Sequence, residues 1–197
     1  MENADNSMRC PWCGTDPLYV AYHDQEWGRP ERDPRRLFEL LMLEAFQAGL
    51  SWITVLRKRP AFRAAFHGFD PETLAIWGEA EVTRLCQDPG IIRHRGKIDS
   101  TLRAARAFQR IEADRGFSPF LWSFTGGQTL DHRPASMAEV PAQTPESQAM
   151  SRALKAEGFS FVGPTITYAF MQASGMVNDH LVACPARLLA FPPQRLI

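Results

Sequence analysis

The stretch DPRRLFELLMLEAFQAG, residues 33–49, decides the fold. Asp33 followed by Pro34 is typical of a helix start, because an aspartate caps free amides and proline suits the first helical position. Gly49 is a plausible end of the helix. The residues between Leu37 and Phe46 are apolar on nearly every side of a helix. Such a helix is surrounded by other elements, so the stretch predicts the central helix of the molecule.

Helix signals continue on both sides of this stretch. Ser51 can cap a second helix, which we expect Pro60 to interrupt because proline lacks an amide hydrogen. Apolar residues spaced by three and four predict an amphipathic helix over 97–115, ended by Gly116. Further helix starts carry a cap followed by proline: Asp70-Pro71, Thr144-Pro145 and Gly163-Pro164.

The sequence predicts an all-α protein of one domain. Residues 125–143 are rich in glycine and proline and are expected to form a loop. Sustained alternation of apolar and polar residues is absent, as are internal repeats. We therefore expect roughly eight to ten helices in a single domain over 1–197, with 1–9 and 186–197 as peripheral tails.

Composition excludes several classes of protein. The chain has 197 residues, of which 22 are basic and 22 acidic. Its formal net charge is therefore zero and gives no indication of a polyanionic partner. The segment 52–110 nevertheless holds eleven basic and six acidic residues. No apolar run is long enough to span a membrane, and the polar start is unlike a secretory signal. We expect a cytoplasmic protein, and without a heptad pattern we expect a monomer.

Cysteine and histidine occur near both ends of the chain. His180 and Cys184 lie one helical turn apart, and Cys10 with His23 would complete a tetrahedral zinc set. Four protein ligands leave no place for water, so such a zinc would be structural, one per chain, and would join the two ends. Taken alone, a His-x3-Cys pattern is more often inert. Cys13 is a competing ligand, and Cys86 is expected to be an ordinary core residue.

A carboxylate on the central helix lies among aromatic residues. Glu44 shares a face with Leu37 and Leu41, where burial would raise its pKa unless a partner is near. A nearby arginine or amide is the ordinary explanation for such a glutamate. Aromatic rings beside a carboxylate can also hold a planar, cationic heterocycle such as a nucleobase. The candidate rings are Trp12, Tyr19, Tyr22 and Trp52; Trp27, Trp77 and Trp122 are expected in the core.

Two turns punctuated by glycine could approach a phosphate. The first, residues 90–97, carries Arg93, Arg95 and Lys97, and the second, residues 158–165, includes Gly163 at the start of a helix. Glycine lets backbone amides come close to an anion, and a helix start favours negative charge. An ordinary solvated basic turn explains the first segment equally well.

Long motifs resemble the bacterial 3-methyladenine DNA glycosylase I family. They cover nearly the whole chain between Cys10 and Cys184. The stretches that carry the resemblance are DPLYVAYHDQEWG (16–28), LEAFQAGLSWI (43–53), GIIRHRGKI (90–98), FVGPT (161–165) and VNDH (177–180). The resemblance implies a helix-hairpin-helix DNA glycosylase fold with a structural zinc site, and excision of N3-methyladenine from alkylated duplex DNA.

The resemblance also implies roles for particular residues. Glu44 and Tyr22 would recognise the adenine edge as catalytic residues, and Gly49-Leu50 would fill the gap left by the extruded base. Arg93, Arg95, Lys97, Gly163 and Thr165 would contact DNA. The stacking walls would be Trp52, Trp12 and Tyr19, and the zinc ligands Cys10, His23, His180 and Cys184.

Two positions depart from the wider superfamily. Its hairpin usually reads Leu-Pro-Gly-Val-Gly, where this chain has FSFVG at 159–163. Its catalytic aspartate usually follows valine in a Val-Asp-x-His context, where this chain has Asn178. A neutral amide cannot balance an oxocarbenium charge as a carboxylate does. The adjacent Asp179 is expected to orient His180 or cap local structure.

These observations predict a monofunctional enzyme whose reaction needs little assistance from catalytic groups. A damaged base flips out of the duplex more easily than an intact one. N3-methyladenine is cationic and leaves as a neutral base, so no strong general acid is needed. No lysine is placed for a Schiff base, and no nucleotide cofactor is expected. The alternatives are a non-catalytic zinc-stapled DNA-binding module and a catalytic zinc hydrolase, which would need an open coordination position.

Overall fold

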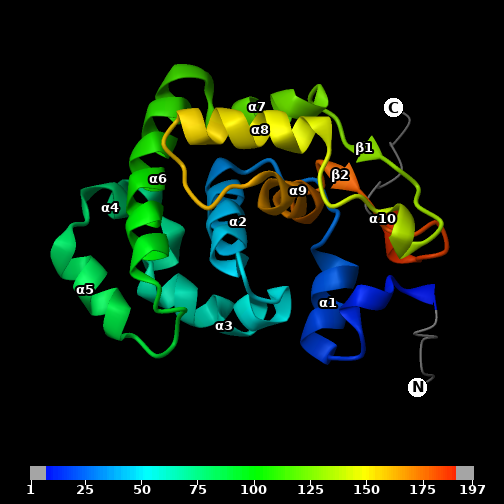
Figure 1. Cartoon of the computed structure of the whole chain (residues 1–197), viewed down its shortest axis with the longest axis horizontal. Coiled ribbons are helices and arrows are strands. Elements are labelled where there is room, and N and C mark those ends of the chain that lie inside the picture. The colour runs from blue at the N-terminus through cyan, green and yellow to red at the C-terminus, as the bar shows by residue number, and fades with distance from the viewer. Residues whose placement is uncertain (1–7, 190–197) are drawn as a thin grey trace, which may run out of the picture.

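The computed structural model describes residues 8–189, which are mostly helical (Figure 1). The short 3₁₀ helices are η2 (Pro11–Cys13), η3 (His67–Phe69), η4 (Ser123–Thr125) and η5 (Met137–Glu139). The α-helices are α1 (Pro17–Gln25), α2 (Pro34–Gln47), α3 (Trp52–Ala65), α4 (Pro71–Ile76), α5 (Glu79–Gln87), α6 (Arg95–Arg115), α7 (Phe117–Trp122), α8 (Pro145–Ala156), α9 (Pro164–Ala173) and α10 (Ala186–Leu189). The two strands are β1 (Leu130–Asp131) and β2 (Val177–Asn178).

Helix α2 is the central helix, as the sequence predicts. The Asp33 carboxylate caps it by accepting a 2.9 Å hydrogen bond from the Arg36 amide. Leu37, Phe38 and Leu41 are fully buried. The helix contacts α3, α6, α7 and α9, so its apolar surface is covered on several sides (Figure 1).

The surrounding helices bring distant parts of the chain together. Helices α8 and α9 pack against each other and are joined by the hairpin 157–163, while α9 also packs on α2 (Figure 1). Helix α4 packs along α6. Helix α1 contacts α3 and α10, so the first and last α-helices of the described chain are neighbours.

The interruption expected at Pro60 is wrong, because α3 continues through it to Ala65. Proline inside a helix costs about 3 kcal/mol. Leu56 and Phe62, which flank Pro60 within the helix, are almost fully buried, and this packing outweighs the lost hydrogen bond. Ser51 begins the helix, but its hydroxyl bonds the Thr54 hydroxyl at 2.8 Å rather than an amide.

The segment expected to be a loop contains regular structure. Leu130–Asp131 pairs in parallel with Val177–Asn178, and Leu130 lies opposite Val177. Strands of two residues are too short to give an alternating pattern, which is why the sequence gives no sign of them. The pairing places β2 beside the segment that leads into η5.

Some residues of the expected peripheral tails pack against the rest of the chain. Arg9 pairs with Asp24 at 3.0 Å. Ala186 and Arg187 are buried, and the Arg187 guanidinium donates a 2.7 Å hydrogen bond to Asp131. The expectation that the tail begins at residue 186 is therefore wrong. The rest of the expected tails, 1–7 and 190–197, lies outside the described residues. No helix within residues 8–189 is long and apolar enough to cross a membrane.

Candidate functional site

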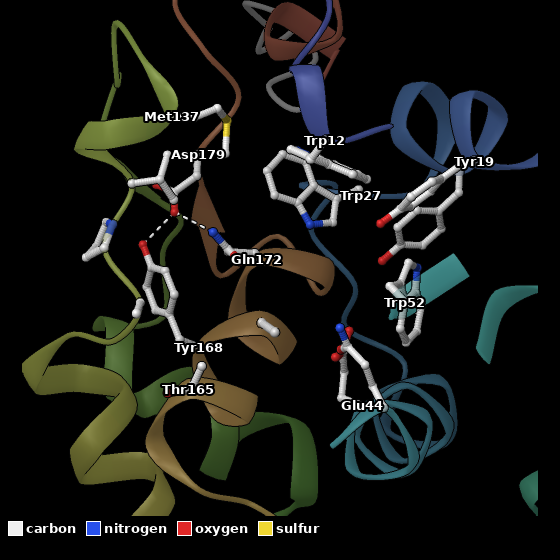
Figure 2. A pocket seen from close by; sticks show the side chains of 16 residues that line it. Trp12, Tyr19, Trp27, Glu44, Trp52, Met137, Thr165, Tyr168, Gln172 and Asp179 are labelled. Carbon is white, nitrogen blue, oxygen red and sulfur yellow. Dashed lines mark hydrogen bonds between the residues drawn. The ribbon is translucent and has the colours of Figure 1, made fainter. Parts of the chain in front are cut away.

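A cavity of about 290 Å³ opens between two walls of the molecule (Figure 2). One wall comes from the N-terminal segment, α2 and α3, and the other from α9, Asp179 and the segment around η5. The lining residues are Trp12, Tyr19, Tyr22, Trp27, Glu44, Gln47, Trp52, Met137, Val140, Pro141, Ala142, Thr165, Tyr168, Ala169, Gln172 and Asp179. The cavity therefore gathers segments from both ends of the chain.

Glu44 is a buried carboxylate aimed into this cavity (Figure 2). Its residue is 2% exposed, and its Oε2 has no hydrogen-bond partner among the described residues. Burial raises the pKa of Glu44 from 4.5 to about 8, because the charged form has lost its hydration. The arginine or amide partner that would explain an ordinary helical glutamate is not found for this oxygen.

Trp52 lies at the first position of α3 and also holds an unsatisfied polar atom. The residue is 6% exposed, and its Nε1 has no acceptor in the described part of the chain. Its ring centroid lies 5.3 Å from that of Tyr22, with the planes at 44°. Tyr22 is buried on α1, where desolvation and then the charge of Glu44 raise the pKa of its phenol well above 10.

Trp12 connects the aromatic residues of the N-terminal segment. Its ring makes edge contacts with Tyr19 at 5.1 Å and with Trp27 at 4.9 Å between centroids. Trp27 is buried, as expected of a core residue, but it also lines the cavity. Sequence reasoning left Trp27 out of the site, although its position in the same segment as Tyr19 and Tyr22 was a usable signal.

The opposite wall contains a hydrogen-bonded network that the sequence did not reveal. The Asp179 carboxylate accepts hydrogen bonds from the Tyr168 hydroxyl at 2.5 Å and the Gln172 amide at 2.7 Å (Figure 2). It also bonds His132 Nδ1 at 2.8 Å. The expectation that Asp179 orients His180 is therefore wrong. The His180 backbone amide donates instead to Asn178 Oδ1 at 3.2 Å.

The turns that are expected to contact DNA differ in their exposure to solvent. Gly49 has a φ of +81°, and Leu50 beside it is 44% exposed. Arg93 and Arg95 are exposed, and Arg95 pairs with Glu79. At the hairpin, Gly163 begins α9, and no atom lies within 4 Å of a Cβ added there, so its backbone is open to approach. Thr165 is exposed on the first turn of α9, at the mouth of the cavity.

Lys97 does not lie where a DNA-contacting residue would. It is 6% exposed, and its ammonium donates hydrogen bonds to the carbonyl oxygens of Phe46 at 2.9 Å and Ala48 at 2.7 Å. The expectation that Lys97 contacts a phosphate is wrong for this reason. The basic pattern of residues 93–97 could not distinguish an inward lysine from an outward one.

Four buried side chains from the two ends of the chain form a cluster that could hold a metal ion. Cys10, His23, His180 and Cys184 offer ligand atoms that all lie within 4.8 Å of one another. Cys10 Sγ and Cys184 Sγ each lie 3.7 Å from His180 Nδ1, and Cys184 Sγ lies 3.6 Å from His23 Nε2. The interaction between the two neighbouring thiols lowers the pKa of Cys184 and raises that of Cys10.

Neighbouring groups fix both histidine rings of the cluster. His23 Nδ1 bonds the Asp24 carboxylate at 2.7 Å, and His180 Nε2 bonds the Trp27 carbonyl at 3.1 Å. Each ring therefore directs its other nitrogen to the centre of the cluster. Cys13 lies outside the cluster and directs its thiol to the Cys10 carbonyl. Cys86 packs against the main hydrophobic core, as expected.

The hairpin between two packed helices and the aromatic cavity beside it, with one carboxylate oxygen unpartnered within residues 8–189, fit a helical DNA glycosylase. A family model described as methyladenine glycosylase matches residues 12–187, and the chain belongs to this family. This membership confirms the resemblance found in the sequence.

Individual relatives agree with the family. The chain is 54% identical over 177 residues to DNA-3-methyladenine glycosylase 1 of Escherichia coli (strain K12), covering 89% of this chain and 95% of the relative. A crystal structure of 3-methyladenine DNA glycosylase I has a TM-score of 0.89 and 54% identity, covering 90% of this chain and 98% of that one. A variant of such an enzyme in complex with 3-methyladenine has a TM-score of 0.88 and 36% identity, covering 90% and 96%.

Proposed function

We propose that the chain excises 3-methyladenine from alkylated duplex DNA and that the aromatic cavity receives the flipped base. The observation that carries the proposal is that two residues lining one cavity, Glu44 and Trp52, each hold a buried polar atom without a partner in the described chain, Oε2 and Nε1. A buried polar atom without a partner is costly, so such atoms in a cavity call for a ligand. A base with both donors and acceptors on its edge meets that requirement.

The charge of the damaged base supports Glu44 as its recognition group. N3-methyladenine is cationic, and a cation beside Glu44 would lower the pKa of that carboxyl and favour its ionised form. The ring of Trp52 offers a face for cation–π attraction, and Tyr22 beside it would read the adenine edge together with Glu44. Normal adenine lacks this charge and cannot stabilise the ionised form of Glu44, so this interaction would favour the damaged base.

The reaction itself needs only a water molecule. Water adds to C1′ of the sugar and releases a proton, the C1′–N9 bond breaks, and its electron pair leaves with the base, which becomes neutral. No strong general acid is required, because the leaving group already carries positive charge. Among the described residues that line the cavity there is no lysine, which favours a monofunctional enzyme without a Schiff base.

The exposed turns are proposed to hold the duplex. Leu50, on the turn after α2, would fill the gap left by the flipped base, and Gly49 would let that turn approach the stack. Arg93 and Arg95 would contact phosphates, as would the backbone at Gly163 near Thr165. Monomeric state and cytoplasmic location stay predictions.

The four-residue cluster is proposed to bind one structural zinc ion. Zinc takes sulfur at about 2.3 Å and nitrogen at about 2.0–2.1 Å in a tetrahedron, which separates sulfur from nitrogen by about 3.6 Å. The three separations of 3.6–3.7 Å in the cluster agree with this value. Two thiols and two imidazoles are a donor set typical of zinc, and no position would be left for a substrate.

The activity is tested by incubating the protein with methylated duplex DNA and separating the released bases by chromatography. We expect free 3-methyladenine from the wild type and much less from Glu44→Gln. DNA binding without any released base would overturn the proposal and favour the alternative, a non-catalytic zinc-stapled binding module.

A further inference from the structure

Lys97 joins three segments that are distant in sequence. The residue lies in the first turn of α6, and its ammonium donates to the carbonyls of Phe46 and Ala48, at the end of α2. The same ammonium lies 5.7 Å from the ring centroid of Phe161, on the hairpin before α9. A charge that is 6% exposed needs such partners, because it has lost its water.

The carbonyls that Lys97 binds belong to the turn that carries Leu50. Ala48 caps the C-terminal end of α2, Gly49 follows with a positive φ, and Leu50 is 44% exposed. The last carbonyls of a helix carry partial negative charge and lack partners within the helix. A cation bound there fixes the direction in which the chain leaves α2, and so the position of Leu50.

The contact with Phe161 extends the connection to the hairpin. Phe161 has a φ of +59° and is 36% exposed. Its ring packs edge-on against His94, with centroids 5.7 Å apart, and His94 Nδ1 caps α6 by accepting from the Lys97 amide at 3.2 Å. The turn with Leu50, the turn with Arg93 and Arg95, and the hairpin thus meet around one ammonium group.

We propose that Lys97 is a positioning residue that fixes the Leu50 turn relative to the hairpin 157–163. Leu50 can then insert into the DNA duplex while the hairpin binds the DNA backbone. The proposal rests on the function proposed above for Leu50. Desolvation lowers the pKa of Lys97, in keeping with a lysine used for internal contacts rather than for phosphate. Its effect on catalysis passes through Leu50, because Lys97 does not line the base cavity.

A double-mutant cycle separates positioning from mere stability. Lys97→Met keeps most of the side-chain volume and removes the ammonium, Leu50→Ala removes the inserted side chain, and the double variant combines them. Excision of 3-methyladenine is measured on a methylated duplex and on a methylated single strand. Affinity for free 3-methyladenine is measured by tryptophan fluorescence. Arg103→Met, which removes an exposed positive charge from the same helix, controls for charge loss.

We expect the loss in Lys97→Met to be about tenfold on duplex and much smaller on single strands, where no stack must be filled. In the Leu50→Ala background the same change should cost about twofold or less, because both residues act through one step. The affinity of Lys97→Met for free 3-methyladenine should stay within about twofold of wild type. The excision rate of Arg103→Met should also stay within about twofold of wild type. Lys97→Arg, which keeps a cation and donors, should retain more duplex activity than Lys97→Met.

Three results would overturn the proposal. Additive losses in the double variant would separate Lys97 from Leu50. Equal losses in excision on duplex and single strand and in affinity for the free base would mean that Lys97 has a general structural role. A failure of both Lys97 variants to fold would mean the same. If the wild type itself releases no 3-methyladenine, it is the proposed function that fails.

Discussion

Glu44 on α2 and Trp52 on α3 line the same cavity, and each holds one buried polar atom without a partner among the described residues, an oxygen and an N–H donor respectively. The two helices are held together by the short turn 48–51, so this donor and acceptor are fixed before any base arrives. Preorganised groups need little rearrangement when a ligand binds, so less binding free energy is lost in ordering them. A ligand that matches their positions therefore binds more tightly.

Glu44→Gln should reduce excision of 3-methyladenine by roughly 10- to 100-fold, since hydrogen bonds to charged groups contribute about 1.5–3 kcal/mol. Single-turnover rates on a methylated duplex measure the loss. Glu39→Gln on the same helix is the matched control, because Glu39 pairs with Arg63 away from the cavity. Equal rates for Glu44→Gln and the wild type would mean that the carboxylate does not recognise the base.

The same substitution should change how stability depends on pH. The pKa of Glu44 is raised to about 8 in the folded protein, so between pH 4.5 and 8 the folded state holds a proton that the unfolded state has lost. Stability of the free protein therefore falls as pH rises through this window. Relative to wild type, Glu44→Gln should gain roughly 2–3 kcal/mol between pH 6 and 8. Urea denaturation at several pH values measures this, and a difference that does not vary with pH would contradict it.

If the cluster binds zinc as proposed, removing the zinc should destabilise the segment that carries Trp12. One equivalent of zinc is expected by elemental analysis, and chelation should lower the melting temperature by roughly 5 °C or more. Cys184→Ala should lose both the metal and stability, whereas Cys13→Ala and Cys86→Ala should keep the metal. A Cys184→Ala protein that stays as stable as wild type but inactive would instead support a catalytic zinc.

Gly175→Ala should destabilise the fold strongly. Gly175 follows α9 with a φ of +68°, and an added Cβ would lie 2.2 Å from the Arg29 carbonyl carbon. The backbones must separate, at a cost of more than about 2 kcal/mol. Gly127→Ala is the matched control: its φ is +77°, but no atom lies within 4 Å of the added Cβ, so about 1–2 kcal/mol of backbone strain is expected. Thermal melts that rank the two variants equally would contradict the steric argument.

Local signals in the sequence are enough to predict most helix starts. The side chains of Asp33, Asp70 and Thr144 accept hydrogen bonds from amides of the first helical turn, as the cap-plus-proline pattern predicts. A cap acts within one helical turn, so its evidence lies entirely in the local sequence. The family motifs likewise place Glu44 and Trp52 close together, because both belong to one short stretch of the chain.

Features that depend on distant contacts were not predictable in the same way. Pro60 has the local signature of a helix break, and only the burial of its neighbours reverses it. Lys97 looks like part of a basic surface until the end of α2 is placed beside it. Asp179 is hydrogen-bonded to His132, Tyr168 and Gln172. The spacing of residues within a single segment does not show that these side chains meet.

The cluster that joins Cys10 to His180 closes a loop of 170 residues, which has a consequence for synthesis. Contacts this far apart form late, because the intervening chain must first be made and ordered. On the ribosome, the aromatic wall at Trp12 and Tyr22 emerges early, while Tyr168 and Asp179 of the facing wall emerge near the end. A nascent chain therefore cannot hold a base until almost all of its residues have been released, and binding competence would report completed folding.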